Sequence, residues 1–235
     1  MLTTVRGEKD YSKVVREFMK QNGLHKIIAF SGGSDAEISG MPKDDPVQLQ
    51  YKAFARNLEE RIIGDAVKKL RNYQIAILTG GTSWGVPNTA TLKAKEYGMK
   101  TIGVFPLAGK KHVLPEDILD IALCIEPLVG ESRWGDESPI FTSLLDGVIV
   151  YGGGAGTLIE CAHILKMNEA IIKNGEPVKY IVPIAGTGGV ADGLPFVWGK
   201  AEVKSLCMPF RKITSGIEAV DILCEQLNLD DFINV

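Results

Sequence analysis

The chain has 235 residues, of which 45% are hydrophobic and 23% charged, and its formal net charge at pH 7 is −3. A mean hydropathy of +0.07 and a pI of about 5.7 are ordinary for a globular protein, and the length suits a single domain over residues 1–235. The mixed, slightly acidic charge argues against nucleic acid or an anionic membrane as the main partner.

The first third of the chain predicts a helix, a strand and a second, longer helix. Apolar residues at three- and four-residue steps indicate a helix from about Asp10 to Asn22, which we expect to form an N-terminal helical extension over residues 1–24. KIIAF (Lys26–Phe30) is typical of a buried strand, and a long helix follows the turn-like segment Gly40–Pro46. The apolar stripe of that helix consists of Tyr51, Phe54, Leu58, Ile62, Ala66 and Leu70.

The remainder of the chain alternates short apolar runs with amphipathic segments. Further strands are predicted at Gln74–Leu78, Thr101–Pro106, Ile121–Ile125, Gly147–Tyr151 and Lys179–Ile184, with a short one near Lys204–Met208. Helices are predicted at Pro87–Tyr97, Thr157–Lys173 and Ile213–Leu227. Together they indicate a Rossmann-like, doubly wound α/β fold, with a mainly parallel sheet of about six or seven strands and helices on both faces.

The cysteines and histidines are scattered and predict no metal site. Cys124, Cys161, Cys207 and Cys224 each lie in an apolar stretch, as buried and reduced cysteines do in a cytoplasmic protein. The N-terminus MLTTVRGEKD lacks the apolar core of a signal peptide, and no apolar run reaches the ~18–20 residues of a membrane span. We therefore expect a cytoplasmic protein without a membrane segment.

Four of the predicted strands end in glycine-rich turns. SGGS follows residue 30, TGGTSWG residue 78, GGGAGT residue 151 and AGTGG residue 184. Glycines permit tight turns in any protein, but the carboxyl ends of parallel strands share one edge, where ligands bind. Bare backbone N–H groups and a following helix N-terminus favour an anion there, best a phosphate. The expected binding residues are Ser31, Gly32, Gly33, Ser34, Gly80, Gly81, Thr82, Gly152, Gly153, Gly154, Gly156 and Thr157.

The third of these turns fits neither common nucleotide motif. Both the dinucleotide fingerprint G-x-G-x-x-G and the Walker pattern are absent. Instead GGGAGTLIE, preceded by TGGTSWGVPNTATLKAKEYGMKTIGVFP, resembles the LOG-like superfamily, also called lysine decarboxylase-like, which includes molybdenum-cofactor carrier proteins. Its motif P-G-G-x-G-T-x-x-E is matched by Gly153, Gly154, Gly156, Thr157 and Glu160, while Gly152 replaces the proline.

The resemblance implies a Rossmann-like protein that forms homodimers or larger homo-oligomers and requires no cofactor. Its ligand would be a nucleoside 5′-monophosphate or a related phosphorylated compound. LOG enzymes cleave the N-glycosidic bond, releasing the base and ribose 5-phosphate. A carboxylate can stabilise an oxocarbenium-like transition state, and the resemblance gives that role to Glu160.

Two interpretations of Glu160 stay open at this point. Thr157-Leu158-Ile159-Glu160 also has the T-x-x-E pattern of a capping box, in which both side chains bind backbone N–H groups at a helix start. A further difference concerns the arginine that LOG enzymes carry before the glycine strand. That position falls at about Glu137, so Arg133 is the candidate replacement. The chain is thus a phosphoribohydrolase or a non-catalytic nucleotide sensor or carrier of a phosphorylated cofactor such as molybdopterin.

Several other side chains of the predicted ligand edge have two interpretations. Trp84 and Trp134 either stack on a base or pack against protein, and Asp192 is expected to cap a helix. The remaining candidates are lysines. Lys93 and Lys95 are typical of a solvated helix face, whereas Lys110 and Lys111 can reach a phosphate.

Overall fold

The computed structural model describes residues 2–5, 8–33 and 40–234. In these residues seven strands form one sheet in the order β1-β5-β4-β3-β2-β6-β7, and every neighbouring pair is parallel. The strands are β1 (Leu2–Val5), β2 (Lys26–Gly32), β3 (Ile75–Thr79), β4 (Lys100–Pro106), β5 (Ile121–Ile125), β6 (Gly147–Tyr151) and β7 (Tyr180–Pro183). The predicted Rossmann-like α/β fold is confirmed.

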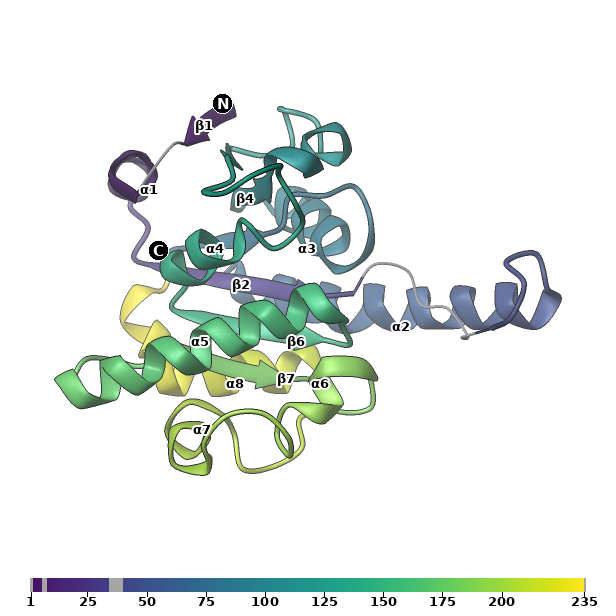
Figure 1. Cartoon of the computed structure of the whole chain (residues 1–235). Helices are drawn as coiled ribbons and strands as arrows, with labels where there is room; N and C mark the ends of the chain where they lie inside the picture. Colours follow the sequence, from purple (N-terminus) through teal and green to yellow (C-terminus); the bar gives the residue numbers. More distant parts are fainter. Residues whose placement is uncertain (1, 6–7, 34–39, 235) are drawn as a thin grey trace.

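Helices cover both faces of this sheet (Figure 1). The α-helices of the described chain are α1 (Glu8–Gln21), α2 (Pro46–Leu70), α3 (Gly85–Glu96), α4 (Ser138–Leu144), α5 (Ala155–Asn174), α6 (Gly189–Gly193), α7 (Ala201–Cys207) and α8 (Gly216–Leu227). Two 3-10 helices, η1 (Leu107–His112) and η2 (Leu229–Phe232), complete the elements. The faces carry α2, α3 and α8 on one side and α1, α4, α5 and α7 on the other.

The alternation of side chains along a strand explains the two buried layers. Ile27 and Ala29 of β2 point into the layer under α1, α4 and α5, whereas Ile28 and Phe30 point into the layer under α2 and α8. All four side chains are buried, because a parallel strand between two helix layers contacts protein on both sides. This is why the strands read as continuous apolar runs in the sequence.

The handedness of the connections creates a switch point between β2 and β6. From β2 the chain winds through α2, β3 and α3 to β4 in one direction, and from β6 it winds through α5 to β7 in the other. Since strand–helix–strand crossovers are right-handed, the helices after β2 and β6 lie on opposite faces. A crevice therefore opens beyond the carboxyl ends of these two neighbouring strands, as in other open α/β sheets.

Three parts of the sequence interpretation are corrected here. The segment predicted as a short strand near Lys204–Met208 is helix α7, because Val203 and Cys207 are buried four residues apart on one helix face. The last helix begins at Gly216 rather than Ile213, with the Ser215 hydroxyl accepting the Glu218 N–H at its start. Strand β1 was not predicted, and it pairs with β5 at the sheet edge.

None of the helices in the described ranges combines the length and apolar character needed to cross a membrane.

Candidate functional site

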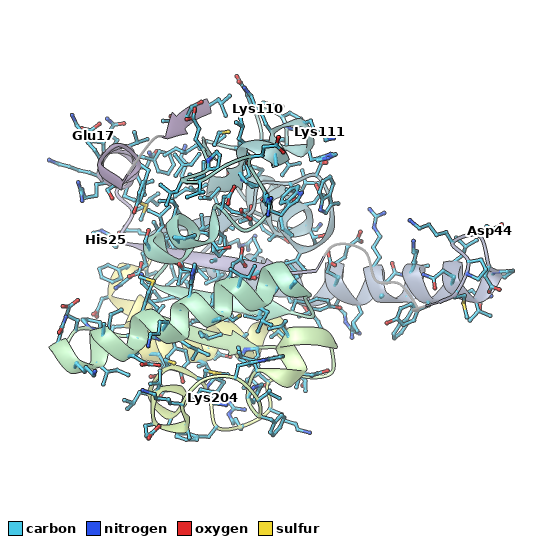
Figure 2. All side chains as sticks on the ribbon, in the orientation of Figure 1. Glu17, His25, Asp44, Lys110, Lys111 and Lys204 are labelled. Atoms are coloured by element: carbon cyan, nitrogen blue, oxygen red, sulfur yellow. The ribbon has the colours of Figure 1, made fainter. Side chains whose placement is uncertain are left out.

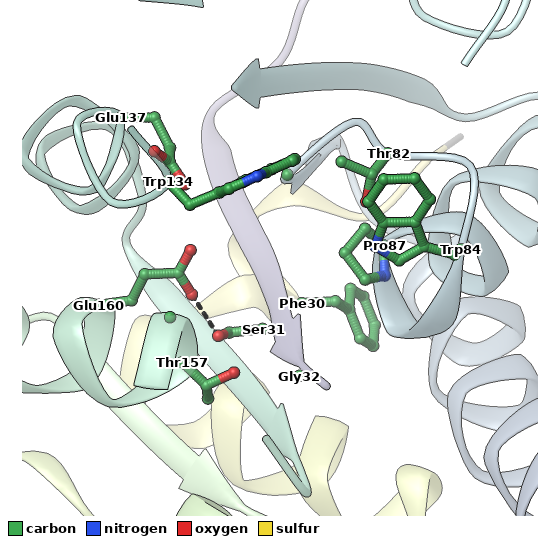
Figure 3. Close-up of a pocket in the computed structure, with 12 residues that line it drawn as sticks. Phe30, Ser31, Gly32, Thr82, Trp84, Pro87, Trp134, Glu137, Thr157 and Glu160 are labelled. Atoms are coloured by element: carbon green, nitrogen blue, oxygen red, sulfur yellow. Dashed lines mark hydrogen bonds between the residues drawn. The ribbon is translucent and has the colours of Figure 1, made fainter. Parts of the chain in front are cut away.

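The glycine-rich turns lie side by side because β3, β2, β6 and β7 are consecutive in the sheet. Between the first three of them lies a cavity of about 130 Å³ (Figure 3). It is lined by Phe30, Ser31 and Gly32 of β2, by Gly80, Thr82, Trp84 and Pro87 around the start of α3, by Gly156, Thr157 and Glu160 of α5, and by Trp134 and Glu137. Seven of the predicted site residues thus share one cavity: Ser31, Gly32, Gly80, Thr82, Gly156, Thr157 and Glu160.

Helix α5 points its N-terminus into the cavity without a side-chain cap. Its N-cap residue is Gly154, and the first intrahelical hydrogen bond runs from the Leu158 N–H to the Gly154 carbonyl, at 3.0 Å. The three N–H groups before Leu158 have no intrahelical acceptor, and they carry the partial positive charge of the helix end. Because Gly156 and Thr157 line the cavity, this end can receive an anion there.

The chain can fold back so tightly before α5 only because Gly153 has no side chain. Its φ is +98°, and a Cβ at this position would lie 2.5 Å from the Thr157 hydroxyl oxygen. At Gly32 a Cβ would meet the Tyr151 carbonyl oxygen at 2.5 Å, since β2 and β6 approach closely where they end. The glycines therefore shape the cavity walls as well as leaving the backbone exposed.

The β7–α6 turn supports the glycine turn from behind. The Gly152 N–H donates to the Thr187 hydroxyl at 2.9 Å, and the carbonyls of Gly152 and Gly153 accept from Ala191 and Val190 at 2.9 and 3.0 Å. The Gly152 N–H is consequently already used within the protein, although the sequence predicted it for phosphate. Gly152, Gly153 and Gly154 are not among the described residues lining the cavity.

Asp192 holds the supporting turn itself. Its carboxylate accepts the N–H groups of Gly186 and Gly188, at 2.6 and 2.8 Å. The fourth glycine-rich turn therefore satisfies these two donors internally. The predicted cap is partly right, because Asp192 lies in α6 and binds the N–H of the preceding N-cap residue, Gly188.

Glu160 projects into the cavity from α5 and does not cap the helix. The capping-box interpretation is wrong, because α5 begins at Ala155 and Thr157 is already its third residue. The Ser31 hydroxyl of β2 instead donates a hydrogen bond to the Glu160 carboxylate (Figure 3). Burial raises the pKa of Glu160 from 4.5 to about 8, helped by the charge of Glu137 and opposed by the Ser31 hydrogen bond.

Glu137 brings a second carboxyl group to the opposite wall. Its carboxylate accepts the Gly135 N–H at 2.8 Å. Burial raises its pKa, the nearby charge of Asp136 adds to that effect, and backbone hydrogen bonds oppose it. Arg133, the predicted replacement for the LOG arginine, is exposed and does not belong to the described lining. None of the twelve lining residues is a lysine, arginine or histidine.

Aromatic rings close one side of the cavity. Trp84 packs edge-on against His112, with ring centroids 4.5 Å apart, and its centroid lies 6.1 Å from that of Trp134. Trp134 also lies over Gly109, where a Cβ would come within 2.9 Å of the indole. Both tryptophans thus pack against protein and line the cavity, so their rings also offer apolar surface to a ligand.

The comparison with known proteins agrees with this architecture. The SLOG cluster4 family matches residues 58–182, which is just over half of the chain and runs from α2 to β7. The chain belongs to the SLOG cluster4 family. The resemblance to the LOG-like superfamily read from the motif is thereby confirmed. No curated protein is similar enough in sequence to match.

Solved structures share the fold of this SLOG cluster4 protein at low sequence identity. A structural-genomics target designated TM1055 is 19% identical, covering 86% of this chain and 99% of its own, with a TM-score of 0.60. The molybdenum cofactor carrier protein of Chlamydomonas reinhardtii is 20% identical, covering 86% and 98%, at a TM-score of 0.56. The molybdenum cofactor binding protein of the phototrophic bacterium Rippkaea orientalis is 22% identical, covering 86% and 97%, at 0.52.

The other predicted residues of the SLOG cluster4 protein lie around the cavity rather than in it. The Gly33 carbonyl accepts the Val86 N–H at 3.2 Å, and Gly81 has a φ of +64° and lies so near β4 that a Cβ there would come within 3.1 Å of the Gly103 Cα. Ser34 lies outside the described residues. Lys110 and Lys111 are exposed on η1 (Figure 2) and are not in the described lining.

The two helix lysines differ from each other. Lys93 pairs at 2.8 Å with Glu96 on an exposed face of α3, as predicted. Lys95 is not simply solvated, because its ammonium group lies 3.2 Å from Asp120, which also accepts the Thr101 N–H at 2.9 Å. Lys95 therefore helps to fix α3 to the edge of β4.

Sequence reasoning missed two residues that shape the site. His112 packs against Trp84, and Thr187 holds the glycine turn. No sequence motif surrounds His112. It lies near Trp84 because an isolated bridge pairs Thr82 with Val113, the neighbours of Ser83 and His112. Thr187 had one available signal, its place in a glycine-rich turn after a strand adjacent to β6.

Proposed function

We propose that this SLOG cluster4 protein binds a phosphorylated nucleotide, with the phosphate at the N-terminus of α5. The observation that carries the proposal is the uncapped start of α5, which opens on the same cavity as the carboxyl group of Glu160. Backbone N–H groups are the donors that phosphate meets at a helix N-terminus. Two proteins of the same fold carry or bind the molybdenum cofactor, which supports a phosphorylated ligand.

Because the described lining contains no basic side chain, backbone N–H groups would be the main donors to the phosphate. A phosphate held only by N–H groups and the helix dipole is bound by directed hydrogen bonds rather than by a neighbouring cation. The cavity of about 130 Å³ takes only part of a nucleotide, because pockets that enclose a whole ligand measure ~300–1,000 Å³. The base would then extend along Trp84 and Trp134, where a π-face can stack.

Calorimetric titration with nucleoside monophosphates and larger phosphorylated cofactors tests the proposal. The informative variant is Gly156→Asp, because a Cβ at Gly156 meets no atom within 4 Å and its φ is not positive. The added carboxylate should weaken binding about five-fold or more, since like charges about 4 Å apart repel by roughly 1–4 kcal/mol. Gly156→Asn, which has the same size without the charge, is the matched control. If the folded wild type binds none of the compounds saturably, the proposal is wrong.

Hydrolysis of the N-glycosidic bond is a second candidate, favoured by the position of Glu160 beside Ser31. As a stabilising carboxylate Glu160 must be ionised, and its pKa of about 8 means that base release should increase as the pH rises towards 8. Incubation with AMP and assay of free adenine tests this, with Glu160→Gln as the inactive variant. Equal release by both proteins would remove Glu160 from the reaction.

A non-catalytic carrier or sensor is the alternative, favoured by the exposed position of Arg133 and by Glu137 in the cavity wall. Saturable binding of a nucleotide or phosphorylated cofactor without any release of base would support it.

A further inference from the structure

A second cavity lies beside β7, at the end of the sheet opposite β1 (Figure 1). Its walls come from the end of β7, from α6 and α7, and from residues 208–214. Its volume is about 870 Å³, against about 130 Å³ for the cavity at the start of α5. Pockets that enclose a whole small molecule measure ~300–1,000 Å³. None of the described residues lines both cavities, so the second one is a separate site of sufficient size for a ligand.

Much of the wall of this second cavity is apolar. Met208 is 4% exposed and belongs to the buried layer, whereas Phe196 and Phe210 are 76% and 90% exposed. Exposed apolar side chains that gather around a hollow are typical of a ligand site. An aromatic molecule in the cavity would bury surface of both rings and pack against them. The large apolar residues of the lining are Pro183, Pro195, Phe196, Met208, Pro209 and Phe210.

Lys204 supplies a positive charge to this apolar cavity from α7 (Figure 2). Its ammonium group donates to the carbonyls of Leu194 and Pro195, at 3.4 and 3.0 Å. Both acceptors are uncharged, and within the described residues Lys204 forms no ion pair. An ammonium group has three donors, so one remains after these two hydrogen bonds. Lys204 is therefore held in place and can still donate to an anion.

The other charges of the cavity nearly cancel. Arg211 and Lys212 also line it, but Arg211 pairs with Glu218. Asp192 is the one acidic residue of the described lining, and its two carboxylate oxygens accept the backbone N–H groups of the β7–α6 turn. Three cations and two anions leave one positive charge in excess. This balance fits a ligand with a single negative charge, as a carboxylate has, better than a phosphate, which carries nearly two.

We propose that the second cavity binds an aromatic carboxylate. The carboxylate of the ligand accepts a charge-assisted hydrogen bond from Lys204, and its ring lies against Phe196 and Phe210. The apolar wall supplies the affinity for the ring, and the single excess charge selects the acid over the corresponding neutral compound. This site and its ligand are distinct from the nucleotide site at the start of α5.

Calorimetric titration of the full chain with 2-naphthoate tests the proposal. The wild type should bind one molecule per chain saturably. 2-Naphthol, which has the same ring system and is uncharged at pH 7, should bind about five-fold more weakly or less, because it lacks the charge-assisted hydrogen bond. Lys204→Met should weaken 2-naphthoate binding by a similar factor and leave 2-naphthol binding unchanged, a difference that general damage to the fold does not produce. Lys204→Arg keeps the charge and should retain binding.

Each variant has a matched control on the same helix or at its start. Lys200→Met also removes one positive charge, at a side chain that is 63% exposed and pairs with Glu169 outside the described lining, and it should bind 2-naphthoate like the wild type. Phe210→Ala should weaken the binding of both compounds, since both use the ring contact. Leu206→Ala removes an apolar side chain that is 53% exposed on α7 outside the described lining, and it should have no effect. Circular dichroism melting curves show that all variants fold.

Three results would each overturn the proposal. They are no saturable binding of 2-naphthoate by the folded wild type, equal effects of Lys204→Met and Lys200→Met, and a stoichiometry that falls below one per chain as the protein concentration rises. The last result would mean that a second copy of the chain covers the cavity. The nucleotide titration concerns the other cavity, so either proposal can fail without the other.

Discussion

At the scale of single residues, the ionisation of Glu160 is coupled to folding. Its pKa is about 8 in the folded protein and has its ordinary value of 4.5 in an exposed chain. Between these values the folded protein keeps a proton that the unfolded chain releases. Since the folded state binds more protons, the contribution of Glu160 to the free energy of unfolding decreases as the pH rises from about 4.5 to 8 and stays constant above that.

Glu160→Gln should remove this pH dependence. Relative to the wild type, the variant should become more stable with increasing pH from 5 to 8, by at most about 1.4 kcal/mol per pH unit. Urea unfolding of both proteins at several pH values measures the difference. Glu17→Gln, at an exposed position on α1, is the control and should show no such trend. A constant difference between Glu160→Gln and the wild type across this range would contradict the burial of the carboxyl group.

The position of Glu160 could not be predicted from the residues next to it. T-x-x-E fits a capping box only if the helix begins at the threonine. Here three glycines let the chain turn early, so the helix starts two residues before Thr157 and carries Glu160 to the cavity. The starting residue of this helix depends on Thr187 and Val190, which lie more than 25 residues further along the chain. A local motif contains no information about them.

At the scale of elements, the turns after β6 and β7 act as one unit. The Thr187 hydroxyl accepts the Gly152 N–H at 2.9 Å and donates to the Ile184 carbonyl at 2.7 Å. It therefore links the glycine turn to the end of the neighbouring strand. Without it a partly buried backbone donor of the glycine turn loses its partner.

Thr187→Val should test this link, since it keeps the shape of the side chain and removes the hydroxyl. We expect the free energy of unfolding to fall by roughly 1–3 kcal/mol, the usual effect of leaving a buried donor without an acceptor. Nucleotide affinity should fall with it, because the N-terminus of α5 follows this turn directly. Thr187→Ser retains the hydroxyl and should restore most of the stability. Chemical denaturation and calorimetric titration give the two measurements; an unchanged Thr187→Val would show that the hydrogen bond is unimportant.

The elements themselves were predictable where one physical signal was sufficient. The central strands are buried on both faces, so their apolar runs indicated them directly. Helix α7 was mistaken for a strand because its run SLCMPF is short, and a short apolar run has no clear period. Strand β1 gives no sequence signal of this kind, since at the sheet edge Leu2, Thr3 and Thr4 are only partly buried or exposed.

At the scale of the whole molecule, the order of the strands brings the site together. The sequence predicted that the glycine turns share an edge, but only the order β3-β2-β6-β7 makes them neighbours. Helix α2 shows the complementary limit. Its periodicity predicted a buried face for Tyr51 and Phe54, but both side chains are exposed, because periodicity shows that a helix has an apolar face and not that the fold covers it.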